Sequence, residues 1–371
     1  MTFPTLDSIS VKGFRSIASI DVVLRPINLL IGANGAGKSN FIGAFSFLRA
    51  IAEGRLQTYV RENGGAEQIL HFGAKLTEKI EIYLSFSEGA STYHLTIGRT
   101  VDDSLFLEQE TSSPYSETTD GRLPSVEPRQ SGEEAGIGLA TLDPEMTARW
   151  IISQRLYWRV YHINDTGTTS PARLTSKLND NHFLRPDGSN LSSILYRLKQ
   201  THRQAYELIV KTVQLALPFF DHFQLQPDPL NEETIRLAWK HKGSDQYFGA
   251  SALSDGSLRF LLLTTLFLLP EALRPPILLV DEPELGLHPA AIGLLASLIK
   301  RASRETQVIV STQSASLLDY FEPEDVLVAE RHAGGTQIKR LDAARLKVWL
   351  EDYSLGELWG KNELGGRPAP E

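Results

Sequence analysis

The chain has no cysteine among its 371 residues, which excludes a disulfide framework. Its longest apolar stretch, residues 260–269, is too short to cross a bilayer, and no basic segment followed by an apolar one opens the chain. Positive charge is also scarce, because 37 Lys and Arg against 45 Asp and Glu leave a net charge of −8. From these absences we expect a cytoplasmic protein with no membrane partner, in which DNA binding must be argued from a local site.

Apolar residues make up 42% of the chain and charged residues 22%, a balance typical of a globular protein. Short aliphatic segments at 7–31 predict strands, the last of which runs into a glycine-rich turn and a helix. More strands are expected at 79–109 and at 155–163, and helices at 190–217. From residue 233 onward the pattern predicts alternating strands and helices, beginning with a strand at ETIRLAWKH, residues 233–241. This pattern predicts an α/β fold with a mainly parallel sheet, an N-terminal antiparallel β subdomain and a helical insertion.

A glycine-rich segment, GANGAGKS at residues 32–39, matches G-x-x-x-x-G-K-[ST] between an apolar strand and a helix. Such a loop turns backbone N–H groups toward phosphates, and the helix start adds the positive end of its dipole. Lys38 is expected to reach the β and γ phosphates of ATP, and the Ser39 hydroxyl to ligate Mg²⁺. A turn that only allows tight packing would explain the glycines but not the Lys38–Ser39 pair. The predicted nucleotide-binding residues are Gly32, Ala33, Asn34, Gly35, Ala36, Gly37, Lys38, Ser39 and Asn40.

Two adjacent carboxylates follow a buried strand in PPILLVDEPELGLHP. The strand delivers Asp281 and Glu282 at its C-terminal end, where open parallel sheets place their ligands. Asp281 is expected to hold Mg²⁺ directly or through water, and Glu282 to act as the general base on the attacking water. Adjacent acids at a strand end are also common as solvent-facing turn residues. The phosphate loop upstream favours the role in Mg²⁺ binding and ATP hydrolysis over this alternative.

Four segments, GANGAGKSN, LSDGS, ILLVDEPELGLHP and VIVSTQS, occur in this order along the chain. In this respect the sequence resembles ABC-type ATPases of the SMC and RecF-like group, and most closely the stand-alone OLD-like "AAA family" ATPases of bacteria. The resemblance implies an ATP-dependent homodimer in which LSDGS of one chain caps the γ-phosphate of ATP bound to the other. In this chain the donors would be Ser254, Gly256 and Ser257, at the start of a helix expected over 258–269. Ser254 as a simple helix N-cap is the alternative.

The same resemblance implies roles for further residues. Gln313 stands where relatives have a switch histidine; it can contact a γ-phosphate or hold water but cannot carry charge. Gln68 is a candidate lid-loop residue sensing Mg²⁺, with an ordinary exposed loop residue as the alternative. Arg15 is a candidate contact to nucleotide phosphate, or else a surface arginine. Residues 284–289 would contact the opposite subunit, and His288 is expected to be structural.

The motifs divide the chain into predicted segments. Residues 111–136 are rich in Ser, Thr, Pro, Gly and acidic residues, and this composition predicts an exposed flexible insertion. The predicted segments are 1–110, an N-terminal ATPase lobe with a β subdomain; 111–150, the insertion; 151–232, a strand and helices; 233–345, the C-terminal ATPase lobe; and 346–371, a C-terminal helix and tail.

Several functions remain open at this point. The leading hypothesis is an ATPase that dimerises as a switch and controls a separate effector, such as a nuclease or toxin, or acts on DNA in bacterial defence or DNA maintenance. The second is an ATP-bound scaffold that restrains the effector without turnover as its output. A third is direct DNA binding through a basic stripe on the helices at 190–217, against which stands a solvated amphipathic face. An energy subunit of a transporter is disfavoured by the long separation between Lys38 and Asp281.

Overall fold

The computed structural model describes residues 5–113, 158–163, 165–332 and 334–366. The chain folds into two compact units. Unit 1 contains residues 1–158, 323–352 and 358–371, and unit 2 contains residues 159–322 and 353–357. Because the chain leaves unit 1 and later returns to it, segments far apart in the sequence meet within that unit.

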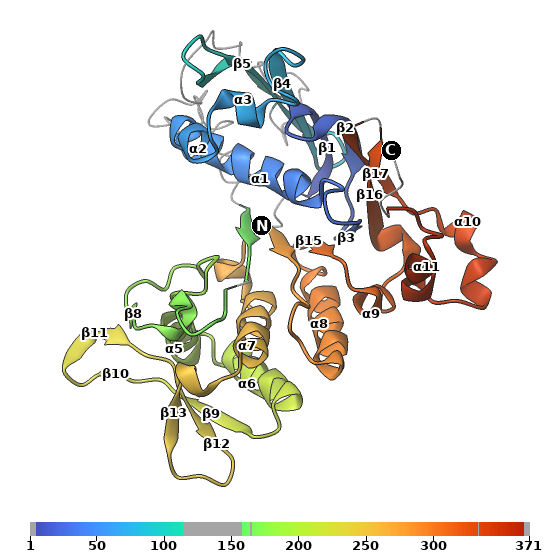
Figure 1. Ribbon diagram of the computed structural model, residues 1–371. Coiled ribbons are helices and arrows are strands. Elements are labelled where there is room, and N and C mark those ends of the chain that lie inside the picture. The colour runs from blue at the N-terminus through green and yellow to red at the C-terminus, as the bar shows by residue number, and fades with distance from the viewer. Residues whose placement is uncertain (1–4, 114–157, 164, 333, 367–371) are drawn as a thin grey trace, which may run out of the picture. The chain divides into compact units, whose positions relative to one another are not determined.

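Five antiparallel strands form the larger sheet of unit 1, in the order β2-β1-β4-β5-β6. Buried and exposed side chains alternate along β4, because successive residues of a strand point to opposite faces. Helix α1 (Lys38–Ala52) packs on β1 (Figure 1), where the rings of Phe14 and Phe47 stack with centroids 5.3 Å apart. The strands are β1 (Leu6–Phe14), β2 (Ile17–Val23), β4 (Lys79–Phe86), β5 (Ser91–Arg99) and β6 (Leu105–Ser113).

Three more strands of unit 1 lie around the phosphate loop, and β3 leads directly into it. β16 (Val326–His332) pairs in parallel with β3 (Ile27–Ile31) and antiparallel with β17 (Gly335–Arg340). β3 is buried along its length after Ile27, so the glycine loop starts from a rigid support. The helical segments around these strands are α2 (Leu56–Glu62), α3 (Ala66–Ile69), η5 (Pro323–Asp325), α10 (Ala343–Leu346), η6 (Trp349–Glu351) and α11 (Leu355–Lys361).

Unit 2 is built on three parallel strands with β14 (Ile277–Asp281) in the middle, between β7 (Arg159–Tyr161) and β15 (Gln307–Thr312). β14 and β15 are buried almost throughout, as expected for parallel strands covered by helices. The predicted helical region 190–217 is two helices, separated at His202. The helices are α5 (Leu191–Thr201), α6 (Arg203–Ala216), α7 (Asp255–Phe267), α8 (Pro289–Ala302), α9 (Ala315–Leu318), η2 (Pro171–Arg173), η3 (Ala250–Ala252) and η4 (Glu271–Leu273).

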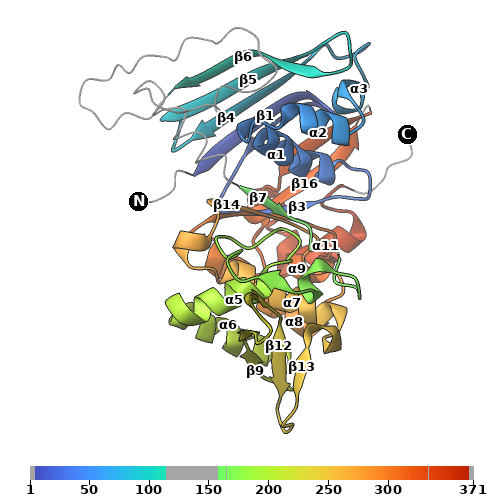
Figure 2. The ribbon, with the colours of Figure 1, turned by 90° about the vertical axis from the view of Figure 1, so that its left-hand side faces the viewer.

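Two small three-stranded sheets complete unit 2, one of which extends away from its helices (Figure 2). The segment ETIRLAWKH was expected to be one strand, and this is wrong. It changes sheet after Ile235, because its first part pairs with β8 and β10 and its second part with β9 and β13. The strands are β8 (Ser176–Lys177), β9 (Phe220–Gln224), β10 (Pro227–Asp228), β11 (Asn231–Ile235), β12 (Ala238–His241) and β13 (Tyr247–Gly249).

The predicted α/β class is confirmed, with parallel strands in both units, N-terminal antiparallel strands and a helical region. The helix expected from Leu258 begins instead at Asp255, because Ser254 caps it. The insertion predicted at 111–150 lies outside the described residues except for 111–113, which belong to β6. The predicted segment boundaries remain predictions. Within the part of the chain that the structure describes, no helix has the length and apolarity to cross a bilayer.

Candidate functional site

The glycine loop between β3 and α1 has the backbone that a phosphate site requires. Gly35 and Gly37 have φ of 81° and 102°, a region that favours glycine. A Cβ at Gly37 would overlap Thr336 of β17, and one at Gly32 would lie 2.5 Å from the Ala329 carbonyl oxygen of β16. Glycine is therefore required here both by conformation and by close approach of neighbouring strands.

Lys38 is directed back along this loop. Its side chain is 6% exposed, and Nζ donates to the carbonyl oxygens of Gly32 at 2.5 Å and Ala33 at 3.1 Å. Ser39 is exposed at the start of α1. The first turn of α1 reads Lys-Ser-Asn-Phe, so no acidic side chain opposes an anion at the positive end of the helix dipole.

Asn40 belongs to a hydroxyl network that sequence analysis missed. Its Nδ2 donates to Ser16 Oγ at 2.6 Å, and Ser16 Oγ lies 2.7 Å from Thr336 Oγ1. The backbone N–H of Thr336 also donates to the Ser16 carbonyl at 2.7 Å. This network ties β1–β2, α1 and β17 together beside Gly37. Ser16 and Thr336 lie hundreds of positions apart, and no sequence signal links them.

The two weaker candidates of unit 1 lie elsewhere. Arg15, at φ 49°, donates to Asn63 Oδ1 at 2.5 Å and lies 3.5 Å from the Tyr59 hydroxyl. Its guanidinium is therefore engaged by α2 and the residue that follows it. Gln68 is an exposed residue of α3. The structure brings neither side chain into the hydrogen bonds of the glycine loop, and their nucleotide roles remain predictions.

In unit 2, the end of β14 presents Asp281 among groups from both neighbouring strands. Asp281 is paired in register with Ser311 of β15, and its Oδ2 lies 3.3 Å from Nδ1 of His162, which follows β7. Ser311 is 1% exposed, and its hydroxyl has no hydrogen-bond partner among the described residues. His162 was missed in the sequence, because it falls within the strand expected at 155–163 and β7 ends at Tyr161.

The structure places Gln313, the candidate switch residue, in contact with Glu282, the candidate base. Glu282 has φ of 45° and its N–H donates to the Ser311 carbonyl at 2.8 Å. A non-glycine residue in this region is strained, and such strain is concentrated at functional sites. Gln313 Nε2 donates to Glu282 Oε1 at 2.5 Å. The amide thus orients the carboxylate that is expected to activate water.

Glu284 is a further carboxylate, which the sequence analysis placed only in the loop 284–289 expected to contact the opposite subunit. Its Oε1 accepts from the Thr312 hydroxyl at 2.6 Å and from the Gln313 backbone N–H at 3.4 Å. Burial raises the pKa of Glu284, these hydrogen bonds partly oppose that shift, and the nearby charge of Glu282 adds to it. The carboxyl group therefore holds the backbone at Gln313 while Glu282 holds its side chain.

The LSDGS turn caps helix α7. Ser254 Oγ accepts from the N–H of Ser257 at 3.2 Å and lies 2.8 Å from the Ser257 hydroxyl. Ser254 is therefore an N-cap, the alternative raised from the sequence, and it is also exposed. Asp255 pairs with Arg173 at 2.9 Å, so its negative charge has a cationic partner within unit 2. Ser254 can be both cap and phosphate donor when the Ser257 hydroxyl donates to it, because its own hydroxyl hydrogen is then available.

The same turn contacts the loop that follows Glu282. A Cβ at Gly256 would lie 2.5 Å from the Gly286 carbonyl oxygen. Arg259, 5% exposed, donates to the carbonyl oxygens of Leu285 and Ile163. Burial lowers its pKa, and the charges of Asp255 and Glu284 act in the opposite direction. His288 caps α8 by accepting from the Ala290 N–H at 3.2 Å, so the structural role expected for it is confirmed.

The residues present fit ATP and Mg²⁺. The glycine loop offers backbone donors and a buried lysine for phosphate. Within unit 1 Ser39 offers a hydroxyl oxygen, and within unit 2 Asp281 and the buried Ser311 hydroxyl offer oxygens, all of the kind that Mg²⁺ prefers. The described residues contain no group of three or more His, Cys, Asp or Glu side chains arranged to hold a metal.

Fold and site together define a P-loop ATPase of the ABC type, in the SMC and RecF-like group. A family model described as "AAA domain, putative AbiEii toxin, Type IV TA system" matches residues 27–319. The chain belongs to this family. It is similar to the Old nuclease of Escherichia phage P2, with 22% identity over 401 residues that cover 94% of this chain and 63% of that protein. The chain thus spans less than two thirds of the length of that relative.

Solved structures with the same fold are SMC head domains. The SmcHead bound to the C-winged helix domain of ScpA gives a TM-score of 0.61 at 16% identity, covering 93% of this chain and all of that one. The Smc head from Pyrococcus furiosus with an extended coiled coil, bound to the C-terminal domain of ScpA, gives 0.59 at 16% identity, covering 94% and 99%. The head domain from Thermotoga maritima gives 0.51 at 14% identity, covering 92% and 100%. The predicted fold and the resemblance to SMC-like and OLD-like ATPases are confirmed.

Proposed function

We propose that this chain binds and hydrolyses ATP with Mg²⁺, and that hydrolysis depends on Glu282 as general base. The observation that carries the proposal is the contact between Glu282 and Gln313 at the end of β14. A carboxylate in a strained backbone position, oriented by an amide, is placed to accept a proton from water. Gln313 positions Glu282 or the water, since an amide cannot itself take up the proton.

The other residues would bind and orient the nucleotide. The loop 32–37 and the start of α1 donate backbone hydrogen bonds to the phosphates, and Lys38 exchanges its carbonyl partners for β and γ phosphate oxygens. Ser39 and Asp281 would hold Mg²⁺, with Gln68 a weaker candidate. The metal, when bound, neutralises phosphate charge and aligns the γ-phosphoryl group.

The first test compares ATP turnover in the wild type and in Glu282→Gln. The amide can still accept from Gln313 but cannot act as a base, so turnover is expected to fall on the order of 100-fold or more while ATP affinity is retained. Glu271→Gln, the same change at an exposed site on η4, is the control. Undiminished turnover in Glu282→Gln would rule out the proposed base, and loss of ATP binding as well would mean that the residue is structural.

We further propose that ATP closes two chains into a homodimer, with Ser254, Gly256 and Ser257 of one capping the phosphate on the other. The exposed position of Ser254 and the pairing of Asp255 with Arg173 support this arrangement. The family description names a putative toxin system and the phage relative is named a nuclease, so we infer that the dimer controls a separate effector of that kind. Identification of a protein that copurifies with the chain, and its release on ATP hydrolysis, tests this role.

Direct DNA binding has less support. The basic stripe anticipated on the helices was Arg197, Lys199, His202, Arg203 and Lys211. Arg197 donates to the Asn181 carbonyl at 2.8 Å and Arg203 pairs with Glu207 at 2.8 Å. Part of the stripe is thus engaged within unit 2. A steep fall of DNA affinity with added salt would revive it.

A further inference from the structure

The C-terminal end of the described chain contacts the beginning of the phosphate loop, residues 32–33, which we call the first arm of the loop. The Ala33 N–H donates to the Gly366 carbonyl at 2.7 Å, and the Gly366 N–H donates to Glu330 Oε1, also at 2.7 Å. Glu330 lies on β16, beside the strand that leads into the loop. A carboxylate, a glycine peptide and a phosphate-loop amide are therefore connected in series within unit 1.

The turn that makes this contact requires two glycines. Gly365 and Gly366 both have φ of 78°, which other residues rarely adopt. A Cβ on Gly365 would overlap Glu330 Oε1, and a Cβ on Gly366 would lie 2.9 Å from Val328 Cγ1. The close approach of the turn to β16 is thus possible only with these residues.

The other side of the same arm holds Lys38. Gly32 lies against Ala329 of β16, so the arm 32–33 is enclosed between β16 and the diglycine turn. The carbonyl oxygens of Gly32 and Ala33 are the acceptors of Lys38 Nζ. Any displacement of the arm therefore moves the two groups that direct the lysine.

We propose that Glu330 and the Gly365–Gly366 turn are positioning residues for Lys38, and that they keep the phosphate loop ready for ATP. The proposal rests on the proposed function for its effect on ATP. The link between Glu330 and Lys38 is itself independent of nucleotide. It predicts that loosening the turn releases Lys38 and weakens phosphate binding, without any change to a residue that contacts ATP.

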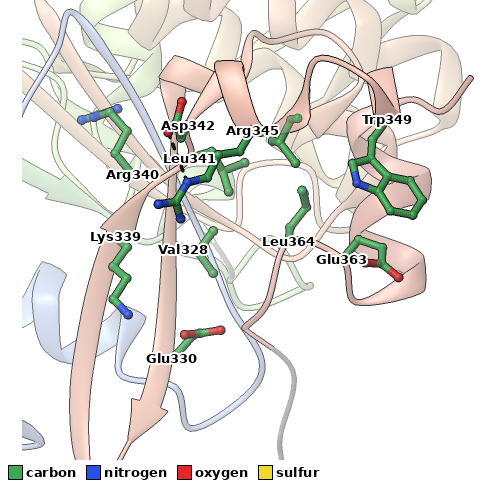
Figure 3. Close-up of a pocket in the computed structure, with 11 residues that line it drawn as sticks. Val328, Glu330, Lys339, Arg340, Leu341, Asp342, Arg345, Trp349, Glu363 and Leu364 are labelled. Atoms are coloured by element: carbon green, nitrogen blue, oxygen red, sulfur yellow. Dashed lines mark ion pairs between the residues drawn. The ribbon is translucent and has the colours of Figure 1, made fainter. Parts of the chain in front are cut away.

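Glu363 provides a matched control for Glu330, because both residues line a cavity of about 350 Å³ beside the turn. Figure 3 shows Glu363 near Trp349, well away from Glu330. Glu363 is exposed and takes no part in the hydrogen bonds of the turn. Glu363→Ala therefore removes the same charge from the same cavity while leaving the contact between Ala33 and Gly366 intact.

The experiment measures two quantities in the full chain: the dissociation constant of ATP and the rate at which an amine-reactive ester labels Lys38, read by mass spectrometry. In Glu330→Ala we expect ATP affinity to fall about threefold to tenfold, the range set by one hydrogen bond, and Lys38 to be labelled several times faster. Glu330→Gln keeps an acceptor oxygen and should restore both values. Glu363→Ala should change neither.

Gly366→Ala offers a second way to displace the turn if Glu330→Ala does not fold, and the same two changes are expected. Equal labelling of Lys38 in the wild type and in a folded turn variant would overturn the inference. Absence of ATP binding in the wild type would instead refute the proposed function, while the labelling rates would still decide whether Glu330 positions Lys38.

Discussion

Glu282 and Glu284 of the DEPE segment are separated by a single residue along the chain but have different surroundings. Glu282 contacts the side chain of Gln313, whereas Glu284 accepts from the Thr312 hydroxyl and the Gln313 backbone. Glu284 Oε2 is buried without a hydrogen-bond partner among the described residues. At the scale of the residue, one carboxyl group is suited to proton transfer and the other to holding the switch residue.

The raised pKa of Glu284 predicts a pH dependence of stability. The folded state raises this pKa above the ordinary value of 4.5. Protonated Glu284 therefore makes its full contribution to the free energy of unfolding below pH 4.5, and this contribution is lost as the pH rises through the folded-state pKa. Glu284→Gln keeps an acceptor for Thr312 but does not titrate. Its melting temperature should therefore increase relative to that of the wild type as pH rises from 4.5 toward 8. A difference that stays constant over that range would show that Glu284 ionises normally.

At the scale of the element, helix α7 combines a capping residue with an exposed turn. Ser254 stabilises the helix through the Ser257 N–H, and Arg259 of the same helix ties it to the loop after Glu282. A substitution that destroys the cap would disturb both, so loss of function alone would not show that the turn contacts phosphate. A substitution that keeps the cap but changes the charge at Ser254 can distinguish helix capping from contact with phosphate.

Ser254→Asp and Ser254→Asn separate them. Both side chains are good N-caps, so the melting temperature of each variant should remain near that of the wild type. Aspartate adds a negative charge where the γ-phosphate of the partner's ATP would dock, and asparagine adds a donor. We expect Ser254→Asp to lose ATP turnover at least tenfold, equivalent to about 1.4 kcal/mol, and Ser254→Asn to retain most of it. Equal activity of the two would leave Ser254 as a cap alone.

At the scale of the whole molecule, the proposed switch requires two copies. The exposed Ser254 turn lies in unit 2 and the phosphate loop lies in unit 1. If the turn completes a site on another chain, nucleotide and dimer formation must be linked. A ligand that binds only the dimer stabilises it by mass action.

Glu282→Gln should therefore accumulate as a dimer in ATP and Mg²⁺. Light scattering after size-exclusion chromatography is expected to give twice the monomer mass with ATP and the monomer mass with ADP. The combination of Glu282→Gln with Ser254→Asp should stay monomeric while still binding ATP. A monomer that holds ATP under all conditions, or a dimer indifferent to Ser254→Asp, would contradict the proposed arrangement.

The sequence alone determined the phosphate loop, the Asp281–Glu282 strand end and the α/β class, because each depends on short-range spacing that a strand or helix converts directly into geometry. It also predicted helical structure at 190–217, but not where that region divides. The order of the motifs along the chain was enough to identify the group of ATPases.

Only the tertiary structure decided what surrounds these motifs. Ser16, Thr336 and Gly366 reach the phosphate loop from distant parts of the chain, and the strand expected at ETIRLAWKH divides because its halves find different partners. Which carboxyl group contacts the side chain of Gln313 likewise depended on neighbours in space. Hydrogen bonds and close approaches between segments far apart in the chain leave no periodic or local trace, so they become visible only when the chain is folded.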